Sequence, residues 1–347
     1  MKRTKTRRTQ KRNKDQSLTI IGINCNGLSG KRDSLMANIE ILKPSVFCVQ
    51  ETKFMKRGLF RVKDYEIFES IRPTGGGSIL TGVHCNLDPV LISDGAHDDI
   101  EVLVVEGNLE NRKCRFINGY GPQEAADLDK RINFFARIEE EVLKAKFEGA
   151  YVCIELDANA KLGCDIIEND PNEKSANGDL LLGIIVRNNL IVCNSTSICK
   201  GLITRRRITV NGKEESIIDF MIVCEELFNV MTEMIVDEGK EYSVESYRKL
   251  GNKVKVIKTD HNMLIGRFNM KVLKKGVNSR KEIFKYDYDE GQKKFKELTS
   301  QNTLSKCFED NDNLKASEKW MKELKNILHR SFKKVRVGQA KLNNDNV

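Results

Sequence analysis

The sequence lacks the features that would place the protein in a membrane or direct it out of the cell. None of its apolar runs reaches the roughly 18 residues that a membrane-spanning helix needs. The N-terminus begins with Lys2 and Arg3 and stays basic, without the apolar stretch of a secretory signal. With 347 residues and 39% hydrophobic residues, the chain can bury a sizeable core. These features predict an intracellular globular protein without a membrane partner.

The cysteine pattern excludes two further classes of protein. Ten cysteines in 347 residues are too few for a disulfide scaffold, and no Cys-x-x-Cys pair or Cys/His cluster has zinc spacing. Half of them lie in apolar, strand-like runs, where a reduced thiol packs as a small hydrophobic side chain: Cys25, Cys48, Cys153, Cys193 and Cys224. We interpret these thiols as core residues.

Negative charge is scarce at the two ends of the chain. Residues 1–16 carry eight Lys or Arg against one acid (+7), and residues 271–347 carry nineteen against eleven (+8), which leaves 32 against 38 (−6) between them. Residues 1–16 also lack a hydrophobic period, which predicts a disordered basic arm. Such an arm suits a phosphate backbone or a nuclear import receptor; the alternative is a solvated tail without a partner.

Between residues 17 and 270, short β-rich runs alternate with a few helical patterns. We expect strands near 18–25, 46–51, 65–70, 78–85, 101–108, 113–120, 150–157, 190–194, 203–210, 217–224 and 262–268. Apolar residues at helical spacing predict helices near 31–42, 128–146 and 177–189. Many short strands with few helices favour a sheet packed on a sheet with helices outside.

Residues 271–347 differ in composition from the preceding domain. They are rich in Lys, Asn and Glu, with helical patterns around 288–299 and 314–332. We predict a basic helical extension or linker that follows the domain.

Two of the expected strands end in polar residues that could serve a site. The first ends in Asn24 and Asn26, which a turn alone would also explain. The second ends in Glu51, a hard oxygen ligand of the kind that Mg²⁺ prefers. A solvated strand terminus is the alternative for Glu51.

Two later strands end in the same way. Tyr120 follows an apolar strand between turn residues, and Asp157 and Asn159 follow another. Residues two apart on an extended segment share one face, so Asp157 can hold or deprotonate a water while Asn159 fixes its orientation. An Asx turn is the alternative for this pair.

One acid lies inside an otherwise apolar strand. Asp219 needs a partner there, because an unpaired buried carboxylate costs several kcal/mol. The chain has four histidines, and His261 combines a strand-like context with a neighbouring acid, Asp260. We predict that Asp219 bonds to His261, fixes its tautomer and raises its basicity.

Together these motifs resemble the endonuclease/exonuclease/phosphatase superfamily over residues 18–268. In order they are Asn-x-Asn-Gly, Gln-Glu-Thr, a Tyr after an apolar strand, Asp-x-Asn-Ala, Ser-x-x-Asp and Asp-His. The chain looks most like the apurinic/apyrimidinic-type endonuclease domain of LINE-type (non-LTR) retrotransposons. The particulars are Asn24–Leu28, Asp157–Ala160, Ala176–Leu182 and Arg187–Ser195.

The resemblance implies an α/β fold, a four-layer α/β/β/α sandwich of two mixed β-sheets with flanking helices. It also implies a Mg²⁺-dependent endonuclease, with Mn²⁺ as the alternative ion, that nicks DNA by activated-water attack. The implied metal ligands are Glu51 with Asn26, and Asp260 supports the metal or the histidine.

The resemblance also assigns roles in catalysis and substrate binding. Asp157 and Asn159 place and activate the water, Asp219 orients His261, and Thr204 belongs to the substrate-binding set. The residues implied to contact the scissile phosphate are Tyr120, Asn24 and His261. Three positions depart from the family pattern, namely Leu156, Thr259 and Arg205. Since none removes a charged catalytic group, an active enzyme is expected.

Substrate and context stay open between several alternatives. Phosphatases and RNA-acting enzymes share the superfamily, and a catalytically inert nucleic-acid-binding relic of a retroelement is a further reading. The expected partner is DNA, with RNA as an alternative, and the expected location is nuclear. No Tyr-x-Asp-Asp motif is present, so we expect the chain to be one domain of a larger polyprotein, with a reverse transcriptase domain of the same element as partner, or a degenerate, truncated copy.

Overall fold

The structure is a computed structural model that forms two compact units, residues 1–274 and 275–347. It describes residues 16–72, 76–95, 100–110, 112–210, 212–250, 253–272, 282–286 and 334–339, with a few positions between 293 and 327. Of the predicted basic arm only Gln16 is described, and it begins the first strand. Among the described residues, no helix has the length and apolar character needed to cross a membrane.

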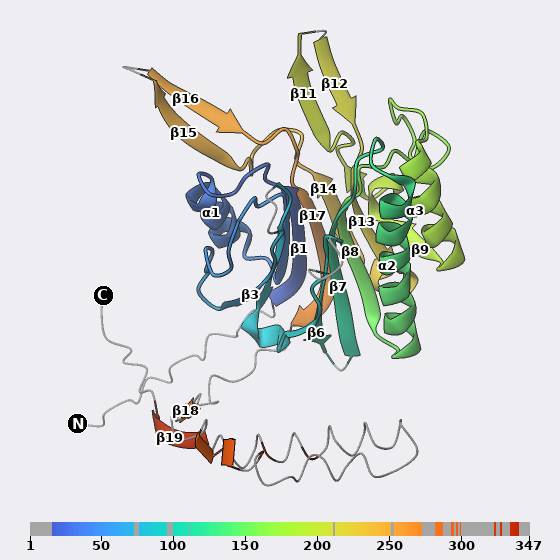
Figure 1. The fold of residues 1–347 in the computed structure, drawn as a ribbon. Helices are drawn as coiled ribbons and strands as arrows, with labels where there is room; N and C mark the ends of the chain where they lie inside the picture. Colours follow the sequence, from blue (N-terminus) through green and yellow to red (C-terminus); the bar gives the residue numbers. More distant parts are fainter. Residues whose placement is uncertain are drawn as a thin grey trace, which may run out of the picture. The chain divides into compact units, whose positions relative to one another are not determined.

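The first unit contains two large mixed sheets (Figure 1). In order across the seven-stranded sheet, the strands are β10 (Cys199–Lys200), β14 (Met231–Val236), β17 (Leu264–Val272), β1 (Gln16–Asn24), β2 (Val46–Gln50), β4 (Ile79–His84) and β3 (Tyr65–Ser70). Those of the six-stranded sheet are β5 (Val90–Ser93), β6 (Val102–Leu109), β7 (Arg112–Tyr120), β8 (Tyr151–Asp157), β13 (Asp219–Cys224) and β9 (Leu190–Val192).

The sheets pack face to face, and helices cover their outer faces (Figure 1). Leu18 and Ile20 of β1 lie in one core with Phe116 of β7. Ile21 and Ile23, on the other face of β1, lie in a second core with residues of α1 (Arg32–Leu42). Because both faces of β1 are covered, its sequence is a continuous apolar run.

The six-stranded sheet is covered by α2 (Leu128–Phe147) and α3 (Ala176–Arg187). Phe134 and Ile138 of α2 belong to the same core as the sheet. The four-layer α/β/β/α sandwich predicted from the sequence is therefore confirmed, and every predicted strand and helix of residues 17–270 coincides with an element of that type.

Two hairpins stand apart from the main sheets. The predicted strand 203–210 is β11 (Arg205–Thr209), which pairs only with the unpredicted β12 (Gly212–Ser216). The second hairpin, β15 (Glu245–Leu250) with β16 (Lys253–Lys258), was not predicted, and neither were β5, β10 and β14. Both hairpins project from the same end of the sandwich (Figure 1).

The second unit contains an antiparallel strand pair, β18 (Glu282–Tyr286) and β19 (Lys334–Gln339), which the sequence analysis did not predict. The helical patterns expected at 288–299 and 314–332 lie largely outside the described residues.

Strand direction places the polar strand ends at one edge of the sandwich. β1 runs parallel to β2 with Asn24 opposite Gln50, and β7 runs parallel to β8 with Tyr120 opposite Asp157. β13 is antiparallel to β8, so its first residue, Asp219, also lies opposite Asp157. Neighbouring strand ends of this kind are where α/β folds assemble their sites.

Candidate active site

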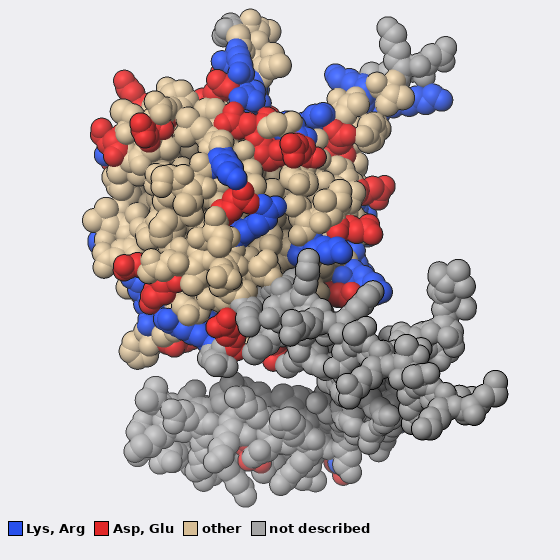
Figure 2. All heavy atoms as spheres, turned by 180° about the vertical axis from the view of Figure 1, so that it is seen from behind, with Lys and Arg blue, Asp and Glu red and all other residues tan. Residues whose placement is uncertain are grey.

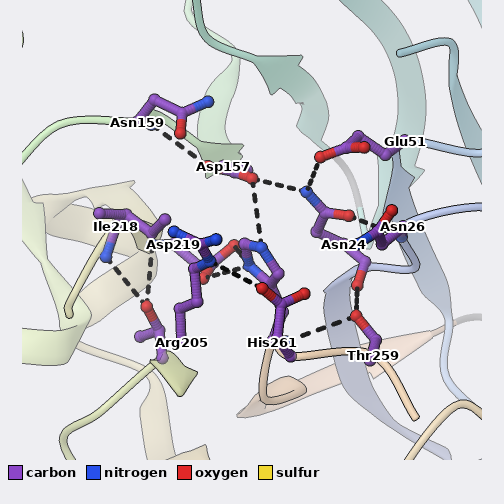
Figure 3. Close-up of polar contacts among 12 residues, drawn as sticks. Asn24, Asn26, Glu51, Asp157, Asn159, Arg205, Ile218, Asp219, Thr259 and His261 are labelled. Carbon is purple, nitrogen blue, oxygen red and sulfur yellow. Dashed lines mark hydrogen bonds and ion pairs between the residues drawn. The ribbon is translucent and has the colours of Figure 1, made fainter. Parts of the chain in front are cut away.

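Side chains from both sheets meet at this edge in one hydrogen-bonded group (Figure 3). The Nδ2 of Asn24, on β1, donates to Glu51 Oε1 at 3.0 Å and to Asp157 Oδ2 at 2.6 Å. Asn24 is fully buried and its Oδ1 accepts the Asn26 N–H at 2.8 Å. One neutral amide thus links two carboxylates that belong to different sheets.

The predicted contact between Asp219 and His261 is present. Both carboxylate oxygens of Asp219 lie close to His261 Nδ1, at 3.0 and 2.9 Å. Nε2 of the same ring lies 3.9 Å from Asp157 Oδ2. Because Asp219 holds Nδ1, the opposite ring nitrogen is directed at Asp157.

The surroundings of the two central groups raise the pKa of both. Burial and the nearby charge of Asp219 raise the pKa of Asp157 to about 7. Burial alone would lower the pKa of His261, but the surrounding carboxylates, Asp219 foremost, raise it to about 9. At neutral pH the imidazole is therefore a cation, and Asp157 lies close to its midpoint of titration.

The oxygens of Glu51 and Asn26 converge on one cationic group, the ammonium of Lys53. Nζ of Lys53 lies 3.1 Å from Glu51 Oε2 and 2.5 Å from Asn26 Oδ1. Burial raises the pKa of Glu51, but hydrogen bonds from Asn24 and Lys53 keep it below its ordinary value. A carboxylate and an amide oxygen aimed at one cation fit a hard divalent ion, and the exposed lysine can move aside.

Asp157, Asp219 and His261 also lie close enough together to ligate one ion. Their atoms are already committed to hydrogen bonds, and a protonated imidazole cannot coordinate a metal. The Glu51 and Asn26 pair is the better metal site on chemical grounds.

Three site residues adopt left-handed backbone conformations that are rare outside glycine. They are Asn26, Glu51 and Asn159, with φ of 45°, 47° and 45°. A left-handed conformation costs free energy in residues other than glycine, and such conformations cluster at functional sites. Their occurrence together at one edge of the sandwich therefore agrees with a functional site there.

Asn159 and Tyr120 lie at the border of the site. The Asn159 N–H donates to Asp157 Oδ1 at 3.2 Å, so the Asx turn considered for this pair does form, and Asn159 Nδ2 donates to the Gly121 carbonyl at 2.8 Å. Tyr120 is close enough to Glu51 to help lower the pKa of that carboxyl. A pocket of about 460 Å³ adjoins Tyr120 and is also lined by Arg72.

Two predicted site residues make their hydrogen bonds outside the central group. Thr204 is fully buried, and its hydroxyl accepts the N–H groups of Ile218 (2.9 Å) and Asp219 (3.1 Å), so it lies beneath the site instead of lining it. The Asp260 carboxylate pairs with Arg205 at 2.9 Å, and neither the histidine ring nor the Glu51 group is its hydrogen-bonding partner among the described contacts.

The sequence indicated no role for several residues that hold the site together. Thr259 donates to the Asn24 carbonyl at 2.7 Å, and Lys240 donates to the carbonyls of Thr259 and His261, which ties the two loops together. Arg205, which stands out in the sequence only as a departure from the family pattern, pairs with Asp260 beside the site. No sequence motif marks these contacts, since each joins positions far apart in the chain.

No family model matches the chain, and no curated protein matches its sequence. Solved structures do. The endonuclease domain of TRAS1, a telomere-specific non-LTR retrotransposon, is 17% identical and aligns over 73% of this chain and 98% of that domain, with a TM-score of 0.53. The AP endonuclease LMAP from Leishmania major is 16% identical over 76% of this chain and 91% of that one, with a TM-score of 0.56.

A third similar structure is the catalytic domain of Xenopus laevis APE2, with 14% identity, 73% and 92% coverage and a TM-score of 0.55. All three belong to the endonuclease/exonuclease/phosphatase superfamily. The chain therefore has the fold of that superfamily, as its motif order predicted. A retrotransposon endonuclease domain is among the structures that share it.

Proposed function

We propose that the protein is a divalent-metal-dependent endonuclease that nicks DNA by attack of an activated water. One observation carries the proposal, namely a connected group of polar side chains at the edge of the sandwich. Asn24 links Glu51 to Asp157, and His261, held by Asp219, lies beside Asp157. It combines an acid near its titration midpoint, a cation and a candidate metal site within one small region.

Asp157 is the residue best placed to hold and deprotonate the water. Its pKa of about 7 suits a general base at neutral pH, because such a base must be ionised yet still able to take a proton. Asn24 donates to one carboxylate oxygen and the Asn159 N–H to the other, so the carboxylate is held in one orientation.

His261 supplies positive charge and a proton donor beside that base. As an imidazolium, its Nε2–H can bond a phosphate oxygen and stabilise the charge that grows during attack. Asp219 holds the ring and balances its charge, and Arg205 lies beside Asp219 (Figure 3). When bound at Glu51 and Asn26, Mg²⁺ or Mn²⁺ would neutralise phosphate charge and polarise the phosphorus–oxygen bond.

Target-site nicking of a retroelement type is the form of activity we favour. The similarity to the TRAS1 endonuclease domain and the positive charge at both chain ends support DNA as the substrate. A nuclear location and a reverse transcriptase domain of the same element as partner complete this proposal. A 3′ phosphatase that shares the fold, from Neisseria and bound to product DNA, keeps phosphatase activity as the alternative.

Nicking of supercoiled plasmid with Mg²⁺, Mn²⁺ or EDTA tests the proposal. His261→Ala and Asp157→Ala should each slow nicking by about 100-fold or more, as removal of an acid–base residue does. His84→Ala is the matched control, because His84 lies on β4 beside the start of β2, at the far end from the site.

Three further substrates separate the alternatives. An abasic oligonucleotide, an RNA duplex and inositol phosphates test repair, RNA cleavage and phosphatase activity in turn. Wild-type protein that nicks no DNA under any of these metal conditions, or nicking unchanged in both alanine variants, would overturn the proposal.

A further inference from the structure

The β15–β16 hairpin carries positive charge that its own structure does not neutralise. Residues 245–258 contain five Lys or Arg against one acid, a net +4. That acid, Glu245, already contacts Lys258 at 3.4 Å and accepts from Tyr247. Among the described residues, neither Arg248 nor Lys255 has an ion-pair partner.

The pairing register makes this charge costly. Arg248 lies directly opposite Lys255, and like charges at facing positions destabilise a two-stranded ladder. The opposite face of the ribbon carries Tyr247 and Val256 as a facing pair, with exposed fractions of 66% and 43%. Beyond its base, where β15 contacts α1, the ribbon is exposed on both faces. A two-stranded ribbon alone is marginally stable, so a bound partner would stabilise this one.

The other projecting hairpin provides a contrast. Residues 205–216 carry four Lys or Arg against two acids, and most of that charge is paired within the protein. Arg205 pairs with Asp260, and Arg206 with both Glu215 and Glu238. Charge available to an external anion is therefore concentrated on β15–β16, where Figure 2 shows Lys and Arg side chains on the projection at the upper right.

The hairpin is also connected directly to the site. β16 ends at Lys258, three residues before His261, and the hairpin projects from the end of the sandwich where the site lies (Figure 1). Six residues of extended strand reach roughly 20 Å beyond that point. A helical turn of duplex DNA spans about 34 Å, so such a ribbon covers more than half a turn beside the cleavage position.

We infer that β15–β16 is a DNA-binding ribbon that grips the phosphate backbone of a duplex beside the cleavage position. The inference rests on the proposed DNA-cleaving function. Cations alternating with an aromatic and aliphatic side chains are the pattern of nucleic-acid surfaces, and a two-stranded ribbon has dimensions that fit the major groove.

The test is the salt dependence of binding to a duplex of about 30 base pairs, roughly three helical turns, measured with full-length protein in EDTA. Arg248→Gln combined with Lys255→Gln should lower the slope of log affinity against log salt by about 1.8, since each phosphate contact contributes about 0.9. Lys255→Glu makes the same change in charge and places opposite charges on the facing pair, so this variant keeps the hairpin paired.

Arg61→Gln combined with Lys63→Gln is the matched control. These exposed cations precede β3 at Tyr65, which lies opposite His84 at the end of the sheet remote from the site. The control should bind with the wild-type slope.

An unchanged slope in both hairpin variants, or an equal decrease in the control, would overturn the inference. Plasmid nicking by the wild-type protein is measured in parallel. Nicking with unchanged slopes would refute the ribbon alone, whereas hairpin-dependent binding without nicking would refute the proposed activity alone.

Discussion

Asn24 carries no charge, yet it joins the two carboxylates that the chemistry needs. Its two donated hydrogen bonds hold Glu51 and Asp157 in place, and its carbonyl accepts from Thr259. A charged residue here would either repel both carboxylates or neutralise both. The amide leaves Glu51 ionised for a cation and Asp157 with a raised pKa.

The two shifted groups predict a bell-shaped pH profile. Activity should rise as Asp157 loses its proton near pH 7 and fall as His261 loses its proton near pH 9. Asp219→Asn removes a negative charge that raises both pKa values, so both limbs should move to lower pH. Initial nicking rates between pH 5 and 11 at constant ionic strength measure this, and an unmoved alkaline limb in the variant would contradict it.

Lys53 predicts a specific metal dependence. Its ammonium occupies the point where Glu51 and Asn26 converge, so it competes there with a divalent ion. Lys53→Met should lower the Mg²⁺ concentration that gives half-maximal nicking by about 2-fold to 5-fold, equivalent to removal of a partly exposed ion pair.

Lys56→Met is the control for this prediction, because Lys56 is exposed in the same loop and has no ion pair among the described residues. Its Mg²⁺ requirement should equal that of the wild type. A requirement for more Mg²⁺ in Lys53→Met would show that the lysine assists metal binding instead of competing with it.

At the scale of elements, Thr204 connects the β11–β12 hairpin to the first residue of β13. Its buried hydroxyl accepts two backbone N–H groups, including that of Asp219. Thr204→Val keeps the shape but leaves both donors without this acceptor, so the free energy of unfolding should fall by about 1–3 kcal/mol. Chemical denaturation measures the loss, with the exposed Thr232→Val as the control.

The Thr204→Val variant should also nick DNA more slowly, because the hydroxyl of Thr204 helps to position Asp219. If the variant kept full activity and unchanged stability, Thr204 would have no role in positioning Asp219.

Glu155 is a second buried group between the sheets. It is 2% exposed, its Oε1 has no hydrogen-bond partner among the described residues, and a side chain at Gly22 on β1 would collide with it. Burial and the charge of Asp219 raise its pKa well above the ordinary value, which favours the neutral carboxyl. Gly22 provides the space for the carboxyl group.

Glu155→Gln should therefore stabilise the protein increasingly as pH rises. A carboxyl whose pKa is raised on folding contributes stability at low pH that is lost as pH rises through the folded pKa. Denaturation at pH 5 and pH 9 should show a larger gain in the free energy of unfolding at the higher pH. The control is the exposed Glu66→Gln, and a gain equal at both pH values would contradict the explanation.

Strands were predicted most successfully where burial on both faces makes the sequence a run of mostly apolar residues. β1 and β2 are buried on both faces, so their apolar runs are unmistakable. β15–β16 was missed because its strands pack against neither sheet and therefore lack the apolar runs of the buried strands. Its existence depends on cross-strand pairing, which a single segment does not reveal.

For the whole molecule, the charge distribution predicts how DNA is held. Residues 1–15 carry +7, whereas residues 17–270 form the body that contains the acidic site. Deleting residues 1–15, which leaves β1 intact from Gln16, should weaken duplex binding and flatten its salt dependence. A chain of equal length with serine at the eight basic positions is the control for length, and it should behave like the deletion.

If the deletion variant bound the duplex with the affinity and salt dependence of the wild type, a role for residues 1–15 in DNA binding would be contradicted. Because the arm and the β15–β16 hairpin are separate segments, their effects on the slope should add when both are changed.

The sequence by itself determined the class of fold and the identity of most polar residues at the site. Apolar periodicity marks strands locally, and Asn24, Glu51, Asp157 and His261 each stand beside such a strand. Periodicity and local context are properties of neighbouring residues, so they can be read along the chain.

Only the tertiary structure decided how those residues are engaged. Three features of the site depend on loops that meet in space. They are the burial of Thr204, the pairing of Arg205 with Asp260, and the position of Lys53 between Glu51 and Asn26. Hydrogen bonds and charge interactions act over a few ångströms across segments that are far apart in sequence. Strand order and register set those distances, and with them the pKa values of Asp157 and His261.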